Sequence, residues 1–260
     1  MHNAQILLQL KGIELEQAGA LLTQGRVGLE VLDFANPTLL TSGWEQRLAE
    51  LLPLCQQWPG PITMHGPFLD LSPASPDPGL RELTLHRYRQ ALDIAGQLKA
   101  RYLVFHSQYN PSVREPDYQA NWVAANTRFW TNLLPEIEAN NATVVLENVW
   151  DPRPDHIMSL LASVNSPRLR SCLDVAHAHL SSEVPLVGWV DGLGDKLAYV
   201  HLSDNQGQWD EHLPLGEGTI DFDSLLAALE TRAFAPWFVL EVPRFRDAVR
   251  SLKFLGRDIN

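Results

Sequence analysis

Short apolar runs recur along the whole chain, and most are followed by a longer stretch with helical periodicity. Eight of these runs are rich in branched aliphatic side chains, which is typical of parallel strands buried on both faces. They lie at 4–10, 27–33, 61–64, 101–105, 143–146, 169–173, 197–202 and 237–240. With 260 residues and 45% hydrophobic content, the chain can bury the core of one large domain. The alternation predicts a single (β/α)8 TIM barrel spanning residues 1–260.

Helical periodicity predicts the segments between the strands. They lie at 13–24, 44–57, 80–98, 117–140, 155–164, from 222 onward and at 244–255. Gly25 is expected to end the first helix, and Pro73, Pro76 and Pro78 predict a rigid surface loop over residues 69–79. A doubly wound open sheet is the alternative arrangement. Because no Gly-x-Gly-x-x-Gly turn follows the first strand, the sequence favours the barrel.

The charge balance is acidic, with a formal net charge of −11 and no run of Lys or Arg. This argues against a nucleic-acid partner, although bound metal ions would create local positive potential. The two cysteines, Cys55 and Cys172, do not suggest a disulfide framework. Neither a secretory signal nor an apolar run of membrane-spanning length is evident, so we expect a cytoplasmic protein without a membrane partner. Eight tryptophans suggest a homo-oligomer interface and leave the oligomeric state open.

Side chains that can bind a metal close six consecutive predicted strands. After the seventh strand, a polar loop adds two more and turns at Gly216 and Gly218 toward the next helix. The candidates are His65, His106, Glu147, Asp174, His177, His201, Asp210, His212 and Glu241. In a parallel barrel the carboxyl ends of all strands meet on one face, where active sites are built. The candidates are therefore expected to converge.

Imidazole nitrogen and carboxylate oxygen are the usual protein ligands for zinc and manganese. A single histidine at a strand end is more often hydrogen-bonded structure, and Glu147 or Glu241 alone could pair with an arginine. Six such strand ends in succession are hard to explain in this way, because buried charges are costly unless they are paired or metal-bound. The sequence therefore predicts a site for a divalent metal, zinc or manganese, with one to three ions.

The motifs at these strand ends resemble those of the xylose isomerase-like barrel superfamily. This superfamily holds sugar isomerases and epimerases together with the endonuclease IV family of apurinic-site nucleases. The matching segments are 146–148 (Leu-Glu-Asn), 173–177 (Leu-Asp-Val-Ala-His), 201–204 (His-Leu-Ser-Asp), 210–212 (Asp-x-His) and 216–218 (Gly-Glu-Gly). The resemblance covers essentially the whole chain, and it implies the (β/α)8 fold and a metal-dependent enzyme.

Two ligand plans follow from the resemblance. Isomerases and epimerases of the group bind one divalent ion, often manganese, and the positions similar to their ligands are Glu147, Asp174, His201 and Glu241. The nucleases bind three zinc ions through nine ligands. The residues that match the further five are His65, His106, His177, Asp210 and His212. Ligand types alone therefore favour the nuclease plan.

Other positions depart from the nuclease pattern. Gln206 and Glu211 stand where those enzymes usually carry a lysine and an arginine, and residues 149–152 (Val-Trp-Asp-Pro) replace a run of small residues. Losing cations that face phosphate removes the attraction that dominates nucleic-acid affinity. The bulk of Trp150 suits a small ligand such as a sugar. The same motifs also resemble proteins usually described as sugar phosphate isomerases or epimerases.

The first functional hypothesis is therefore a divalent-metal-dependent isomerase or epimerase of a sugar or sugar phosphate. The metal would stabilise an enediolate while Glu147 and Glu241 remove and return the proton. His177 would contact a substrate hydroxyl or hold a second ion. Three aromatic residues are candidates for substrate binding, although packing is an alternative role for each: Trp150, Phe68 and Trp209.

The second hypothesis is a multinuclear zinc phosphodiesterase or phosphatase related to endonuclease IV, in which Glu147 bridges ions and the further histidines serve only as ligands. A third hypothesis is a binding protein that keeps the fold of an enzyme but has lost its activity. The complete set of ligand-type residues argues against it. Substrate identity, metal identity and metal number stay open at this point.

Overall fold

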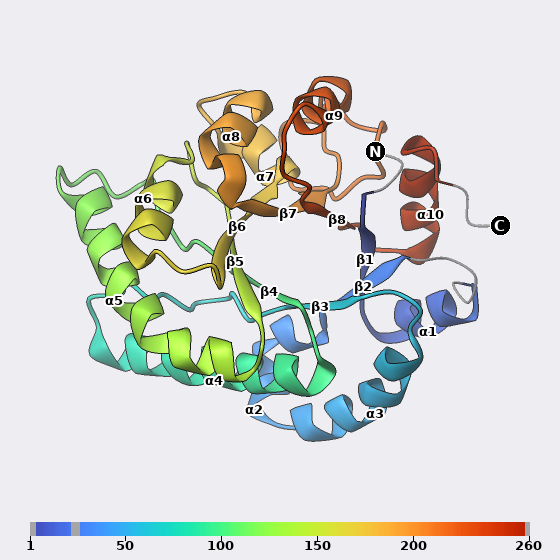
Figure 1. Ribbon diagram of the computed structural model, residues 1–260, viewed down its shortest axis with the longest axis horizontal. Helices are drawn as coiled ribbons and strands as arrows, with labels where there is room; N and C mark the ends of the chain where they lie inside the picture. The colour runs from blue at the N-terminus through green and yellow to red at the C-terminus, as the bar shows by residue number, and fades with distance from the viewer. Residues whose placement is uncertain (1–3, 22–26, 258–260) are drawn as a thin grey trace.

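Eight parallel strands close into a barrel in chain order (Figure 1). The computed structural model describes residues 4–21 and 27–257. The strands are β1 (Ile6–Leu10), β2 (Gly28–Val31), β3 (Ile62–His65), β4 (Tyr102–His106), β5 (Thr143–Glu147), β6 (Leu169–Asp174), β7 (Leu197–Leu202) and β8 (Trp237–Leu240). Because β1 pairs in parallel with both β2 and β8, the sheet has no open edge. The predicted (β/α)8 barrel is confirmed.

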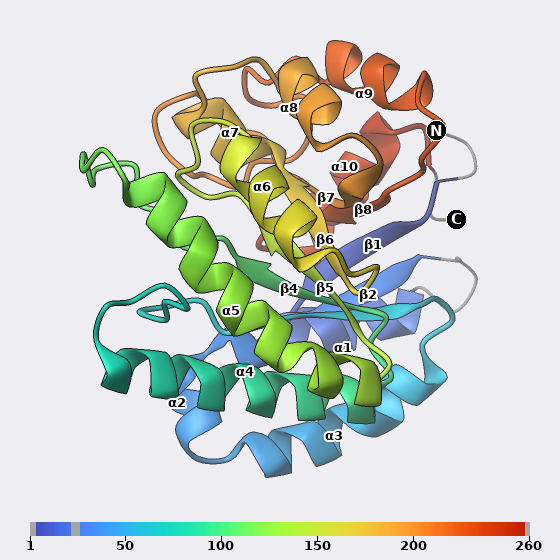
Figure 2. The ribbon, with the colours of Figure 1, turned by 60° about the vertical axis from the view of Figure 1, so that its left-hand side comes forward.

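Helices surround the barrel on the outside (Figure 1). They are α1 (Gly12–Leu21), α2 (Pro37–Thr41), α3 (Trp44–Gln57), α4 (Pro78–Leu98), α5 (Tyr118–Ala139), α6 (Asp155–Val164), α7 (Val175–Ser181), α8 (Leu186–Leu193), α9 (Phe222–Glu230) and α10 (Phe245–Phe254), with short 3-10 helices η1 (Asp33–Ala35) and η2 (Gly194–Lys196). Figure 2 shows the long helices α4 and α5 along one flank, where they pack against each other and against β3 and β5 respectively.

Most predicted helices are present, with differences at their ends. α4 begins at Pro78 instead of Leu80, because the Asp77 carboxylate caps it by accepting from the backbone N–H groups of Gly79 and Leu80. The predicted end of the first helix at Gly25 lies outside the described residues. α2, α7 and α8 were not predicted. α7 spans 7 residues directly after β6, and α8 is apolar with two glycines in 8 residues, so neither gives a clear amphipathic signal.

The barrel interior is built in layers, because side chains two positions apart on a strand share a face. One apolar layer is formed by Leu7, Val104, Val145, Cys172, Tyr199 and Val239, which belong to one buried cluster. Two residues further along five of these strands come polar side chains: Gln9, His106, Glu147, Asp174 and His201. Glu241 follows Val239 in the same way, just beyond β8. The apolar layer thus forms the floor of a polar site at the carboxyl ends of the strands.

The outer core lies between the strands and the helices, where Trp130, Trp189 and Tyr88 are among the largest fully buried side chains. Cys55 and Cys172 are both free thiols, as the sequence suggests. Within residues 4–21 and 27–257, none of the helices combines the length and apolar character that a membrane crossing requires.

Candidate metal centre

Four side chains from four neighbouring strands meet at the carboxyl end of the barrel. Glu147 ends β5, Asp174 ends β6, His201 lies in β7 and Glu241 follows β8. Each offers one ligand atom, and these four atoms lie within 4.8 Å of one another. Glu147, Asp174 and His201 are buried, and the Glu241 side chain is only 12% exposed. This is the quartet that the sequence resemblance pointed to, and its atoms are close enough to share one ion.

Each member of this quartet keeps one buried atom without an aligned hydrogen-bond partner in the described chain: Glu147 Oε1, Asp174 Oδ2, His201 Nδ1 and Glu241 Oε2. Buried polar atoms are normally satisfied, and leaving one unpaired costs free energy. Four neighbouring side chains that each keep such an atom suit a cation that accepts nitrogen and oxygen ligands. The residues present therefore fit a divalent metal ion.

The other side-chain atom of each member is held by a neighbour. Gln9 donates to Glu241 Oε1 at 3.0 Å, and the backbone N–H of His177 donates to the Asp174 carboxylate at 2.7 Å. His65 Nε2 lies 3.3 Å from Glu147 Oε2. His201 Nε2 lies 3.3 Å from the carboxylate of Glu30 on β2. Each member of the quartet is therefore held by a contact on one atom, and its other atom is left without an aligned hydrogen bond in the described chain.

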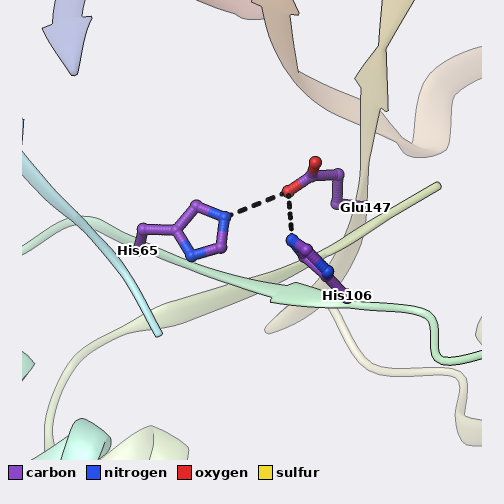
Figure 3. A group of neighbouring side chains, drawn as sticks. All are labelled: His65, His106 and Glu147. Atoms are coloured by element: carbon purple, nitrogen blue, oxygen red, sulfur yellow. Dashed lines mark hydrogen bonds and ion pairs between the residues drawn. The ribbon is translucent and has the colours of Figure 1, made fainter. Parts of the chain in front are cut away.

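A second group shares Glu147. His65 from β3 and His106 from β4 both direct their rings at one oxygen of this carboxylate (Figure 3). Their Nε2 atoms lie 3.3 Å and 3.6 Å from Glu147 Oε2. Phe68 stacks on the His106 ring, with ring centroids 4.3 Å apart and an angle of 18° between the planes. His65, His106 and Glu147 thus form a separate candidate position for an ion.

A third group lies on the loop side of the site. Asp210 Oδ2 is 3.3 Å from His177 Nε2 and 3.1 Å from His212 Nε2. His177 Nδ1 is also 3.2 Å from Glu147 Oε1, so this group adjoins the quartet. All nine residues predicted from the sequence are thus brought together on one face of the barrel.

Asp204 closes the loop that carries Asp210 and His212. Its carboxylate accepts backbone N–H groups from Asn205, Gly216, Gly218 and Ile220, at 2.8–3.2 Å. Asp204 also pairs with Leu213 as an isolated antiparallel bridge. A Cβ at position 218 would collide with the Asp204 carboxylate, and position 216 has a positive φ of 82°, which explains the two glycines.

The loop after β5 carries Val-Trp-Asp-Pro at residues 149–152 in place of a run of small residues. The loop is built around the buried carboxylate of Asp151. Asp151 accepts from Ser107 Oγ at 2.8 Å, from the backbone N–H of Val149 at 2.8 Å and from His156 Nε2 at 2.6 Å. Tying the loop to β4 and α6 in this way leaves Trp150 pointing outward, with 58% of its surface exposed.

Charges within the site perturb each other. Burial lowers the pKa of His201 and His177, but the surrounding negative groups outweigh it and raise both well above the ordinary range. Burial also lowers the pKa of His212, but its hydrogen bond to Asp210 and the nearby carboxylates outweigh this and raise the pKa to about 9. Burial, together with the neighbouring carboxylates, raises the pKa of Asp174 to about 7. Protons therefore occupy the site in the absence of a cation, and a bound metal would displace them.

A cavity of about 310 Å³ opens from these groups toward β1, β2 and β8. It is lined by Phe68 and by ligand candidates that include His106, His212 and Glu241. Its size lies at the lower end of the range for small-molecule pockets. Among the described residues that line it, Lys11 is the only lysine or arginine.

The three predicted substrate-binding aromatics differ in position. Phe68 lines the cavity. Trp150 and Trp209 lie on the loops after β5 and β7, are 58% and 74% exposed, and do not belong to the described lining of this cavity.

Sequence reasoning missed Glu30 and Gln9, which lie beside the quartet. Both are buried within apolar strands, Glu30 in β2 and Gln9 in β1. The predicted site residues lie at or just beyond strand ends, whereas Glu30 and Gln9 lie within strands. A charged residue in the middle of a strand expected to be buried was the available signal, because such a charge needs partners.

Comparison with known proteins gives several relatives. An uncharacterised protein of Methanocaldococcus jannaschii is 28% identical over 79% of this chain and 72% of its own length. Fructoselysine 3-epimerase of Escherichia coli O157:H7 is 26% identical over 64% of this chain and 61% of its own length. A probable endonuclease 4 of Mycobacterium leprae is 25% identical over 65% of this chain and 69% of its own length. The chain thus spans about two thirds of these relatives.

Solved structures share the fold over nearly the whole chain. A D-tagatose 3-epimerase-like protein superposes with a TM-score of 0.80 at 24% identity, covering 97% of this chain and 96% of the other. A Thermus thermophilus protein, from crystals soaked with zinc chloride, gives a TM-score of 0.79 at 28% identity with the same coverage. The family model described as xylose isomerase-like TIM barrel matches residues 28–257. The chain belongs to this family.

Proposed function

We propose that the protein is a divalent-metal-dependent isomerase or epimerase of a sugar or sugar phosphate. The observation that carries this proposal is the quartet. Its four ligand atoms lie within 4.8 Å of one another beside a cavity of about 310 Å³, and each member keeps a buried atom without an aligned hydrogen bond in the described chain. Similarity to fructoselysine 3-epimerase supports the same class of chemistry.

The bound ion would polarise a substrate carbonyl and the adjacent hydroxyl, which makes the proton on the neighbouring carbon more acidic. The carboxylates of Glu147 and Glu241 would then remove and return this proton. They come from β5 and β8, with β6 and β7 between them, and in this proposal they would approach the substrate from different directions. Such an arrangement is what inversion at one carbon requires, since the proton leaves one face and arrives at the other.

Other residues would fix the substrate. His177 would contact a hydroxyl, and Phe68, stacked on His106, supplies an apolar wall for one face of a sugar. Lys11 is the lining residue suited to an anionic group. It would favour a sugar phosphate over a neutral sugar.

A second candidate function, multinuclear phosphoester hydrolysis, is favoured by a specific observation. His65 and His106 converge on Glu147, and His177 and His212 converge on Asp210. In that chemistry each of these groups would hold its own zinc ion. The loop after β7 speaks against a nucleic-acid substrate, because Gln206 stands in place of a cation and its side chain donates to the Glu217 carbonyl at 2.9 Å.

Solvent exchange tests the first proposal. The metal-loaded protein would be incubated in deuterated water with ketohexoses and their phosphates, and each sugar followed by NMR. We expect deuterium at the carbon next to the carbonyl, and a new epimer or isomer. The reaction should be lost with Glu241→Gln, while the exposed Asp93→Asn serves as the matched control. No exchange into any sugar by the metal-loaded protein would contradict the proposal.

Metal stoichiometry separates the two candidates. In the isomerase, His65→Ala and His212→Ala should leave the ion in the quartet, so metal content per chain is unchanged. In a trinuclear phosphoesterase, each variant should lose zinc, and abasic DNA or phosphate esters would be the substrates to assay.

A further inference from the structure

Glu30 is a fully buried acidic residue to which neither candidate function assigns a role. It lies in the middle of β2, and its side chain is 0% exposed. A buried carboxylate is stable only when its oxygens accept enough hydrogen bonds. Three donors surround it: Gln9 Nε2 at 2.9 Å, the Tyr199 hydroxyl at 2.7 Å and His201 Nε2 at 3.3 Å.

When a bound metal displaces one proton from His201, the contact with Glu30 fixes which ring nitrogen keeps the other. Because the Glu30 carboxylate accepts, the proton of this contact belongs to Nε2 of the imidazole. Nδ1 is then the atom left for a ligand. It is the His201 atom without an aligned hydrogen bond in the described chain, and it lies 2.9 Å from Glu241 Oε2 and 3.5 Å from Glu147 Oε2.

The contact with Gln9 reaches a second member of the quartet. Gln9 Nε2 donates to Glu30 Oε1 at 2.9 Å and to Glu241 Oε1 at 3.0 Å. Glu30 therefore anchors the amide that holds one oxygen of Glu241. The other oxygen of Glu241, Oε2, has no aligned hydrogen bond within the described residues and lies 2.9 Å from His201 Nδ1.

We propose that Glu30 is a positioning residue for the metal centre, which holds His201 as the Nε2-protonated tautomer and, through Gln9, turns Glu241 Oε2 toward the same ion. Partners of this kind behind a ligand orient it and increase its basicity, and their loss typically weakens metal binding about 10–100-fold. The inference rests on the metal quartet of the proposed function, but it holds for either chemistry, because it concerns the ion and not the substrate.

Metal affinity tests the proposal directly. We expect Glu30→Gln to raise the dissociation constant for zinc and manganese about 10–100-fold in a competition with a chelator. Tyr199→Phe is the matched control, because it removes another buried donor to Glu30 but leaves the contacts with His201 and Gln9. Its dissociation constant should stay near that of the wild type. Equal dissociation constants for the wild type and a folded Glu30→Gln variant would overturn the proposal.

A measurement on the unaltered protein keeps the proposal testable if Glu30→Gln does not fold. With isotope-labelled cadmium and nitrogen, NMR should show coupling from the metal to Nδ1 of His201 and a proton on Nε2. Coupling to Nε2 instead would refute the assigned tautomer. These readouts need no substrate, so a wild-type protein that binds metal through Nδ1 but fails to exchange sugar protons would contradict the isomerase proposal and leave the role of Glu30 intact.

Discussion

Replacing Asp204 by asparagine should loosen the loop that presents Asp210 and His212. In the folded protein, Asp204 Oδ1 accepts from the backbone N–H groups of Asn205 and Ile220, and Oδ2 accepts from those of Gly216 and Gly218. Asparagine keeps one acceptor oxygen. Its NH2 group can only donate, so it would face two N–H groups that also donate.

The magnitude follows from these contacts. Two hydrogen bonds to a charged acceptor are lost, and each contributes about 1.5–3 kcal/mol. Asp204 is 0% exposed, so water cannot replace them without opening the loop. We therefore expect Asp204→Asn to lower the free energy of unfolding by about 3–6 kcal/mol.

Urea unfolding followed by tryptophan fluorescence measures this loss as a shift of the midpoint. Asp93→Asn, at an exposed position on α4, makes the same chemical change and should alter the free energy of unfolding by less than about 0.5 kcal/mol. If Asp204→Asn unfolds at the same urea concentration as this control, the carboxylate does not close the loop and the reasoning is wrong.

Further predictions concern protons and substrate charge. In the metal-free protein the pKa of His212 is raised to about 9, and those of His177 and His201 are also raised, so the folded state binds more protons than the unfolded state between pH 7 and 9. Its Tm should fall across this interval, and a constant or rising Tm would contradict the assigned shifts. Because a cation must displace these protons and that of Asp174, the Tm gain from added metal should be larger at pH 8 than at pH 6, and thermal melts at both values check this. Lys11→Met should raise KM for a sugar phosphate about tenfold and leave KM for the neutral sugar unchanged. An equal change in KM for the sugar phosphate and the neutral sugar would show that Lys11 does not recognise an anionic group.

The sequence predicted the barrel because its strands and helices have different hydrophobic periods, and because no element breaks their alternation. It also predicted that His65, Glu147 and Glu241 would meet, although they are far apart in the chain, since parallel strands place all their carboxyl ends on one face. The same periodicity could not reveal α7, which spans 7 residues and depends on capping by Asp174.

Other features depend on tertiary contacts that no single-chain pattern encodes. The loop position of Trp209 is clear from the sequence, but its 74% exposure depends on how the loop after β7 folds around Asp204. Glu30 stands out as a charge within an apolar strand, but its partners are set by the fold: Gln9 lies opposite it in the β1–β2 pair, and Tyr199 and His201 come from β7, which does not neighbour β2 in the sheet.

The most direct test of the metal centre is the metal content per chain of protein purified without added metal, measured by mass spectrometry. The account predicts one or more bound zinc or manganese ions in the wild type, and their loss when Glu147→Ala removes the carboxylate that the first two groups share. A wild type that holds no divalent metal, even after incubation with zinc or manganese, would contradict it. So would a Glu147→Ala variant that keeps the full content.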